Sequence, residues 1–229
     1  MSTDKNRILI VGLPKSGTSI LAYRVAACFD NTKIFFEPGK EKGLLNDKIH
    51  EEIFYSGRKN VLTKCLFVPN EEKNIKEVSK YYNKKILIYR DPRDWMISAY
   101  LYQWRQLNEQ NIDKNIADIK NKEPNPGQVS FRSLLNKKFP ERVANNYKRL
   151  INELNMLDSD WMKLKYEDFV SNNLDQLNNY LGREINPEVE VGKKFQRVAR
   201  SKTYGNWRDW FNDKDVSFFK ETLDSILIG

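Results

Sequence analysis

The stretch that decides the fold is RILIVGLPKSGTS, which occupies residues 7–19. Its first half, residues 7–12, is a short apolar run that ends in glycine, a pattern typical of a buried strand. After a turn rich in small residues, apolar side chains recur at helical spacing from Ile20 to Phe29. The sequence therefore predicts a strand, a tight loop and a helix that starts near Ser16.

The rest of the chain repeats this alternation of strands and helices. Strand-like apolar runs follow at residues 33–36, 60–68, 85–89 and 161–166. Asp91 and Pro92 predict the N-cap and first turn of a helix to about Leu107. Another helix is predicted from Asn70 through Tyr82, and a last one over 214–226.

These elements predict an α/β fold, with a central parallel sheet of about five strands flanked by helices and a P-loop-like start. No repeat or linker divides the chain, so residues 1–229 are predicted to form a single domain. Residues 108–128 are rich in Asn, Lys and Pro and are predicted to be a mobile loop over the ligand-binding site, although an ordinary surface loop would have the same composition. In such folds ligands bind beyond the carboxyl ends of the strands.

Composition excludes several classes of function. The 229 residues carry a net charge of +8, which fits either a polyanionic ligand or a simply soluble basic protein. Two separated cysteines and one histidine argue against a disulfide framework and against a metal cluster. Because no signal peptide and no apolar run of membrane-spanning length is seen, a cytoplasmic protein without a membrane span is expected.

The turn GLPKSGTS, residues 12–19, is built to bind phosphate. Successive backbone N–H groups in such a turn converge on an anion, and the helix N-terminus adds partial positive charge. The turn differs from the loop of nucleotide triphosphatases, because Thr18 stands where those enzymes need lysine. Lys15, inside the turn, is instead placed to stabilise a phosphate that leaves during group transfer.

The run PKSGTS, residues 14–19, resembles the 5′-phosphosulfate loop of sulfotransferases. The resemblance implies that the donor is 3′-phosphoadenosine 5′-phosphosulfate (PAPS) and that adenosine 3′,5′-bisphosphate (PAP) is the product. It implies that Lys15 contacts the leaving phosphate and the bridging oxygen. The loop residues that would supply the other donors are Ser16, Gly17, Thr18 and Ser19.

Two further segments resemble the family in the expected order. Arg90 at a strand end and Ser98 eight residues later match its 3′-phosphate motif, although Arg90 would equally suit a surface ion pair with Asp91 or Asp94. Residues 200–211, RSKTYGNWRDWF, resemble the C-terminal signature, with Ser and Lys in place of Lys and Gly at Ser201 and Lys202. The 3′-phosphate contacts implied there belong to Arg200, Ser201 and Lys202. Tyr166, in a Tyr-Glu-Asp run, is implied to pack on adenine, with core packing as the alternative.

The base that activates the acceptor is less clearly marked. The histidine of the family's Lys-Thr-His motif is replaced by Cys65, a poor base. We expect Glu37, directly after the second strand, to be the base, with Lys64 stabilising the transferred sulfonate; the alternative for Glu37 is a turn or helix cap. His50 is a third option for the base, but a lone histidine in a polar stretch is typical of a surface residue.

The predicted function is a PAPS-dependent sulfotransferase that acts by in-line attack of an acceptor hydroxyl of a carbohydrate or small molecule, without a metal and without nucleic acid as a partner. One alternative is a P-loop nucleotide kinase or triphosphatase, which the residue at position 18 disfavours. The other is a non-catalytic basic protein that binds glycan or nucleic acid, which would leave the ordered motifs unexplained.

Overall fold

The computed structural model describes residues 5–38, 47–67, 75–107, 145, 147–150, 152, 157, 159–192 and 203–223. Its backbone contacts divide the chain into two compact units, each made of two chain segments. The first unit comprises residues 1–89 and 153–202, and the second comprises residues 90–152 and 203–229.

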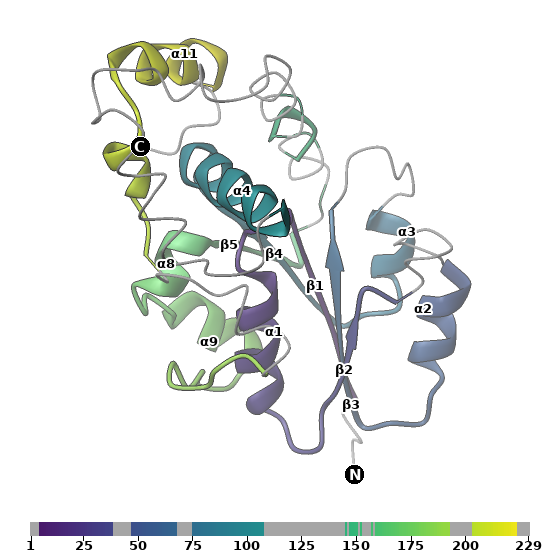
Figure 1. Ribbon diagram of the computed structural model, residues 1–229. Helices are drawn as coiled ribbons and strands as arrows, with labels where there is room; N and C mark the ends of the chain where they lie inside the picture. Colours follow the sequence, from purple (N-terminus) through teal and green to yellow (C-terminus); the bar gives the residue numbers. More distant parts are fainter. Residues whose placement is uncertain are drawn as a thin grey trace. The chain divides into compact units, whose positions relative to one another are not determined.

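The first unit is built on one parallel sheet (Figure 1). Its strands are β1 (Asn6–Gly12), β2 (Lys33–Phe36), β3 (Asn60–Leu66), β4 (Lys84–Tyr89) and β5 (Trp161–Lys165). They lie in the order β2-β3-β1-β4-β5, and every neighbouring pair is parallel. The prediction of an α/β fold with about five parallel strands is thus confirmed.

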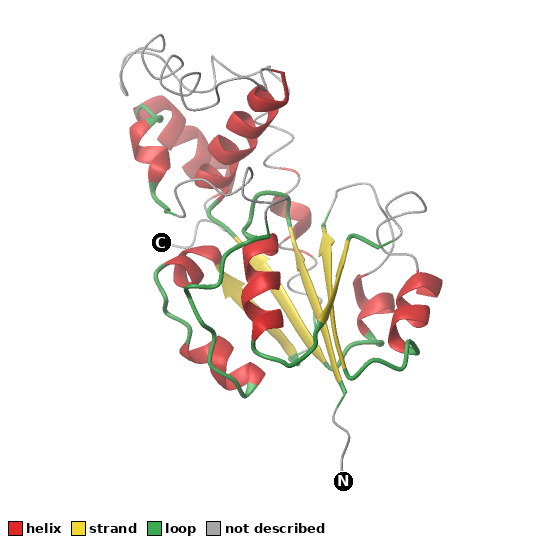
Figure 2. Ribbon diagram, turned by 60° about the horizontal axis from the view of Figure 1, so that its bottom comes forward, coloured by secondary structure: helices red, strands yellow, loops and turns green. Residues whose placement is uncertain are grey.

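Helices cover both faces of this sheet (Figure 2). One face packs on α1 (Thr18–Ala27), α8 (Tyr166–Val170) and α9 (Asp175–Leu181) through a single apolar core. The other face carries α2 (Asp47–Phe54) and α3 (Ile75–Ser79). The predicted fifth strand ends one residue early because Tyr166 begins α8, and the helix predicted from Asn70 is described only from residue 75 onward.

Arg7 is a fully buried cation that ties β1 to the end of α2. Its guanidinium donates to the backbone carbonyls of Phe54 at 3.2 Å, Arg58 at 2.7 Å and Lys59 at 3.2 Å. Carbonyls at a helix C-terminus have no partner within the helix and carry partial negative charge. Arg7 therefore satisfies carbonyls at the carboxyl end of α2 and holds that end of the helix to β1.

The second unit contains α4 (Pro92–Leu107), the 3₁₀ helix η2 (Asn206–Asp209) and α11 (Asp213–Leu223). Asp91 is the N-cap that was predicted, because its Oδ1 accepts the backbone N–H of Arg93 at 2.8 Å. The last helix was predicted over 214–226 and is described over 213–223. The predicted mobile loop, 108–128, lies outside the described residues and stays a prediction. The single domain predicted over residues 1–229 also stays a prediction.

Candidate functional site

The loop between β1 and α1 has the backbone of an anion cradle. Lys15 has a φ of 72° and Gly17 a φ of 84°, so two residues of the turn are in the left-handed region. The N–H of Ser16 donates to the carbonyl of Leu13 at 3.1 Å, which closes the turn. Alternation of right- and left-handed residues makes successive N–H groups face one concave side, where an anion binds.

Ser16 supplies a second sign of a ligand. Its side chain is fully buried, and among the described residues no group makes a hydrogen bond with its hydroxyl. A buried hydroxyl without a partner costs free energy, so native proteins rarely keep one that no ligand or water satisfies. The loop also opens directly onto the N-terminus of α1, which has no side-chain cap. Both features fit a bound phosphate or sulfate group.

Both glycines of the loop are required by close packing. A Cβ on Gly12 would lie 2.5 Å from the carbonyl oxygen of Ile88, and a Cβ on Gly17 would lie 2.7 Å from Cδ2 of Tyr166. The Tyr166 ring is buried and belongs to the apolar core. The structure thus shows Tyr166 against the loop backbone, while the adenine contact implied for it stays a prediction.

Glu37 and Lys64 form an ion pair at the carboxyl-terminal edge of the sheet. Lys64 Nζ lies 2.5 Å from Glu37 Oε1, and the two side chains are 4% and 18% exposed. The N–H of Glu37 also donates to the carbonyl of Lys64 at 2.7 Å, which extends the β2–β3 ladder beyond Phe36. Since β3 separates β2 from β1, the ends of those two strands are about 10 Å apart.

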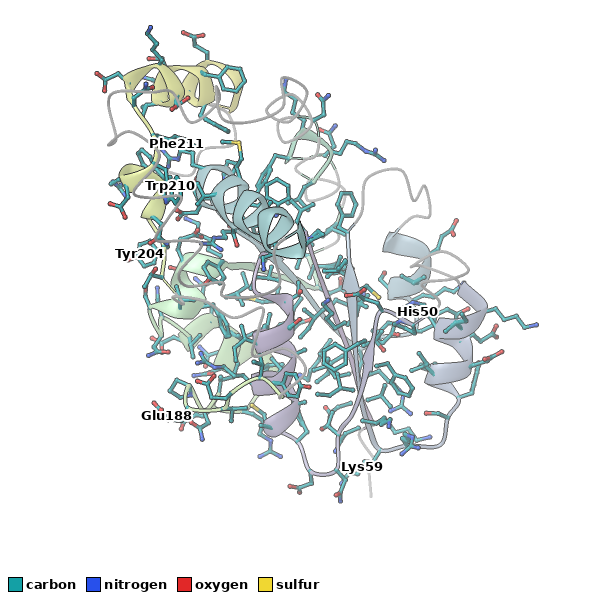
Figure 3. All side chains as sticks on the ribbon, viewed as in Figure 1. His50, Lys59, Glu188, Tyr204, Trp210 and Phe211 are labelled. Carbon is teal, nitrogen blue, oxygen red and sulfur yellow. The ribbon has the colours of Figure 1, made fainter. Side chains whose placement is uncertain are left out.

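His50 is fully buried, so the expectation of a surface residue is wrong (Figure 3). It lies on α2, and its Nδ1 is 2.7 Å from the hydroxyl of Tyr82, which in turn donates to Thr63 Oγ1 at 2.9 Å. Whether Nδ1 of His50 donates to or accepts from the Tyr82 hydroxyl depends on the tautomer of the imidazole. Burial raises the pKa of the Tyr82 phenol. The three hydrogen-bonded side chains of His50, Tyr82 and Thr63 lie under α2, on the face of β3 opposite to the apolar core around α1.

In the second unit, the two residues of the predicted 3′-phosphate motif are both buried. Arg90 is 8% exposed and Ser98 is 7% exposed. Arg90 Nη2 donates to the carbonyl of Thr203 at 3.4 Å, and its own carbonyl accepts the hydroxyl of Tyr147 at 2.7 Å. A guanidinium with fixed orientation at the start of a helix is a suitable ligand for a phosphate.

The segment from Thr203 to Trp210 packs on the first turn of α4. Asp94 accepts the backbone N–H groups of Gly205 and Trp207. The Trp207 ring lies under two cations, with Cζ of Arg93 4.1 Å and Cζ of Arg208 4.5 Å from its centroid. The tryptophan of the C-terminal signature is therefore part of a cluster of arginines.

Three predicted ligands, Arg200, Ser201 and Lys202, lie outside the described residues. Within the described ranges no group of three His, Cys, Asp or Glu side chains could hold a metal ion. The helices described there also lack the length and apolar character needed to cross a bilayer. That the reaction needs no metal stays a prediction.

Sequence reasoning missed the role of Asp94, which it considered only as a surface partner of Arg90. Asp94 is the third residue of α4, a position where a side chain often bonds back to the N-cap. Its actual partners lie 111 and 113 residues away. No local pattern identifies such a contact, and the nearest signal is a carboxylate inside an otherwise basic motif.

Comparison with known proteins gives one family match. The model of the sulfotransferase domain matches residues 5–190. A search of the curated proteins found no match.

Several solved structures have a similar fold. Mouse sulfotransferase SULT7A1 complexed with PAP has a TM-score of 0.57 at 17% identity, over 96% of this chain and 83% of that one. Retinol dehydratase in a complex with retinol and PAP has a TM-score of 0.52 at 15% identity, over 96% and 81%. A sulfotransferase from Alicyclobacillus acidocaldarius has a TM-score of 0.51 at 15% identity, over 96% and 93%.

Proposed function

The chain belongs to the sulfotransferase family, and we propose that it holds the 5′-phosphosulfate of PAPS in the loop of residues 14–19 and transfers the sulfuryl group to an acceptor hydroxyl. It is therefore an enzyme of sulfuryl transfer. The kinase and the non-catalytic binding protein that were kept as alternatives have no support from the family match. The PAP found in the mouse enzyme and in retinol dehydratase supports PAPS as the donor.

The buried Ser16 hydroxyl and the left-handed backbone of Lys15 and Gly17 support the donor end of this proposal. Ser16, Thr18 and Ser19 offer hydroxyl and N–H donors to the 5′-phosphate. The ammonium of Lys15 neutralises the charge that collects on the bridging oxygen as the sulfuryl group departs. In the second unit, Arg90 and Ser98 are proposed to bind the 3′-phosphate. Tyr166 and residues 200–202 remain proposed donor contacts on the family resemblance.

Glu37 is proposed to be the catalytic base. The acceptor oxygen forms a bond to sulfur, the bond between sulfur and the bridging phosphate oxygen breaks, and the electron pair stays on the departing PAP. The acceptor proton passes to the carboxylate of Glu37. Lys64 holds Oε1 of that carboxylate in place and adds positive charge beside the transferred sulfonate.

The observation that carries the proposal is a shared backbone feature of Lys15 and Glu37. Among the described residues, four that are not glycine have a positive φ, and two of them are asparagines, which adopt it readily. The other two are Lys15 at 72°, in the loop that follows β1, and Glu37 at 48°, directly after β2. Such backbone strain persists where a side chain must be aimed at a ligand. Of the three side chains predicted to act on the transferred sulfuryl group, Lys15 and Glu37 carry it.

Binding of the donor is tested by thermal unfolding with PAP and with ATP plus magnesium. PAP is expected to raise the melting temperature, and ATP with magnesium is expected to have little effect. Stabilisation by ATP and not by PAP would exclude the proposal. Transfer itself is measured with labelled PAPS against a panel of sugars, aliphatic alcohols and phenols; we expect carbohydrate or other aliphatic hydroxyls to be the better acceptors. A cytoplasmic location remains a prediction from sequence.

A further inference from the structure

Asp94 lies between the two residues that are proposed to bind the 3′-phosphate. Arg90, Asp94 and Ser98 follow one another at four-residue spacing, and they are 8%, 2% and 7% exposed. Residues four apart in a helix lie on the same face, so Asp94 and Ser98 are one turn apart on one side of α4. A carboxylate in this position repels a phosphate dianion, and its burial carries a further cost unless it is bonded. Its presence in the motif therefore needs a reason.

The bonds of Asp94 supply that reason. Its Oδ2 accepts the N–H of Gly205 at 2.5 Å, and its Oδ1 accepts the N–H of Trp207 at 2.9 Å. Each oxygen thus holds one backbone donor of a segment that is more than 100 residues away in the chain. Hydrogen bonds to an ionised carboxylate are about twice as strong as bonds between neutral groups. The charge of Asp94 is consequently directed at this segment, whose Trp207 ring also packs against the guanidinium groups of Arg93 and Arg208.

The same segment is also bonded to Arg90. Arg90 Nη2 donates to the carbonyl of Thr203, so the backbone from Thr203 to Trp207 is held at three points by Arg90 and Asp94. Gly205 has a φ of 76°, and this left-handed turn brings the N–H groups of residues 205 and 207 toward one carboxylate. A guanidinium that shares a bond with a fixed backbone has fewer orientations to lose when a phosphate binds.

We propose that Asp94 is a positioning residue for the 3′-phosphate of the donor. It fastens residues 203–207 to the first turn of α4 and thereby holds the Arg90 guanidinium in its binding orientation. The inference rests on the proposed function, in which Arg90 and Ser98 bind that phosphate. Asp94 itself does not contact the donor in this scheme.

The test compares PAP with adenosine 5′-monophosphate, which lacks the 3′-phosphate. In Asp94→Asn one oxygen becomes an amide that cannot accept the backbone N–H, while the size of the side chain is kept. The preference of the wild-type chain for PAP is expected to fall by about tenfold or more, as the loss of one charge-assisted bond implies. Affinity for the monophosphate, KM for the acceptor and kcat at saturating PAPS should stay within about threefold of wild type.

Asp215→Asn is the matched control, because Asp215 is also buried in the second unit and accepts the backbone N–H of Asn212. It should lower stability and leave the PAP preference unchanged. An Asp94→Asn chain that folds and keeps the full preference would overturn the inference, and so would equal weakening of both nucleotides. If Asp94→Asn does not fold, Asp94→Glu keeps the carboxylate but moves both oxygens; a lowered preference supports the inference and an unchanged one overturns it. A wild-type chain without preference for PAP would instead contradict the proposed function.

Discussion

Nζ of Lys64 donates a hydrogen bond of 2.5 Å to Oε1 of Glu37, so a cation of β3 and a carboxylate that follows β2 form one ion pair at the edge of the sheet. No local sequence pattern around either residue predicts this contact. The pair fixes the carboxylate that we propose as base and leaves a cation beside it.

Glu37→Gln should lower kcat by about 100-fold or more, because loss of a general base typically costs that much. The substitution keeps the size of the side chain and an oxygen that can accept a bond from Lys64. The measurement is the rate of transfer from labelled PAPS at saturating donor and acceptor. Glu51→Gln, on the exposed face of α2, is the control and should keep full activity. Full activity in Glu37→Gln would show that another group takes the proton.

Replacement of Lys15 should separate activity from stability. Lys15→Ala and Lys15→Gly both remove the ammonium and should both abolish transfer. Lys15→Gly should nevertheless be more stable than Lys15→Ala by about 1 kcal/mol, because glycine adopts a positive φ without strain. Urea unfolding of the two variants measures the difference. Equal stabilities would mean that the left-handed conformation at Lys15 carries no cost.

Gly17→Ala should destabilise the chain more than Gly57→Ala. Both glycines have positive φ, at 84° and 70°, so both substitutions strain the backbone. Only at Gly17 would the new methyl meet the Tyr166 ring, whereas a Cβ on Gly57 meets nothing within 4 Å. We expect a loss of about 1 kcal/mol at Gly57 and of about 2–4 kcal/mol at Gly17, where overpacking adds to strain. Similar losses at the two sites, measured by urea unfolding, would contradict the packing argument.

The same substitution at two buried arginines should mainly lower stability at Arg7 and mainly weaken donor binding at Arg90. Arg7→Met leaves the carbonyls of Phe54, Arg58 and Lys59 without their shared donor, and we expect it to lower the free energy of unfolding by about 3 kcal/mol. Its effect on KM for PAPS should be small. Arg90→Met should raise KM for PAPS by about tenfold or more with a smaller loss of stability. The proposed role of Arg90 fails if its substitution affects stability alone.

Tyr82 should make the fold sensitive to alkali. Burial raises the pKa of its phenol above the ordinary value, so at high pH the folded chain keeps a proton that the unfolded chain has released. The stabilisation is complete below about pH 10, the unfolded-state pKa, and is lost progressively as the pH rises above it, by up to about 1.4 kcal/mol per pH unit. Tyr82→Phe should therefore show a shallower fall of the unfolding free energy above pH 10 than the wild-type chain. Parallel curves in urea unfolding between pH 9 and 11 would rule out this contribution.

The strands of the first unit and the start of α4 in the second were predictable, because their signals are local. The apolar runs of β1 and β4 each end at or near a residue of a phosphate motif, and Asp91 with Pro92 marks the start of α4 correctly. The ends of the third and fifth predicted strands were each placed too late. The fifth strand shows the reason: the side chain of Tyr166 continues the apolar pattern of β5, but its backbone is already the first residue of helix α8.

The sequence by itself determined the parallel α/β sheet, the phosphate-binding turn and the family, because hydrophobic periodicity and a short motif depend only on neighbouring residues. Only the tertiary structure decided that Lys64 meets Glu37, that Tyr166 presses on Gly17 and that His50 is buried beside Tyr82. It also decided that Asp94 binds the backbone of Gly205 and Trp207 rather than a neighbouring arginine. These contacts join residues that lie far apart in the chain. Their formation depends on strand order and on the packing of whole elements, which no local pattern encodes.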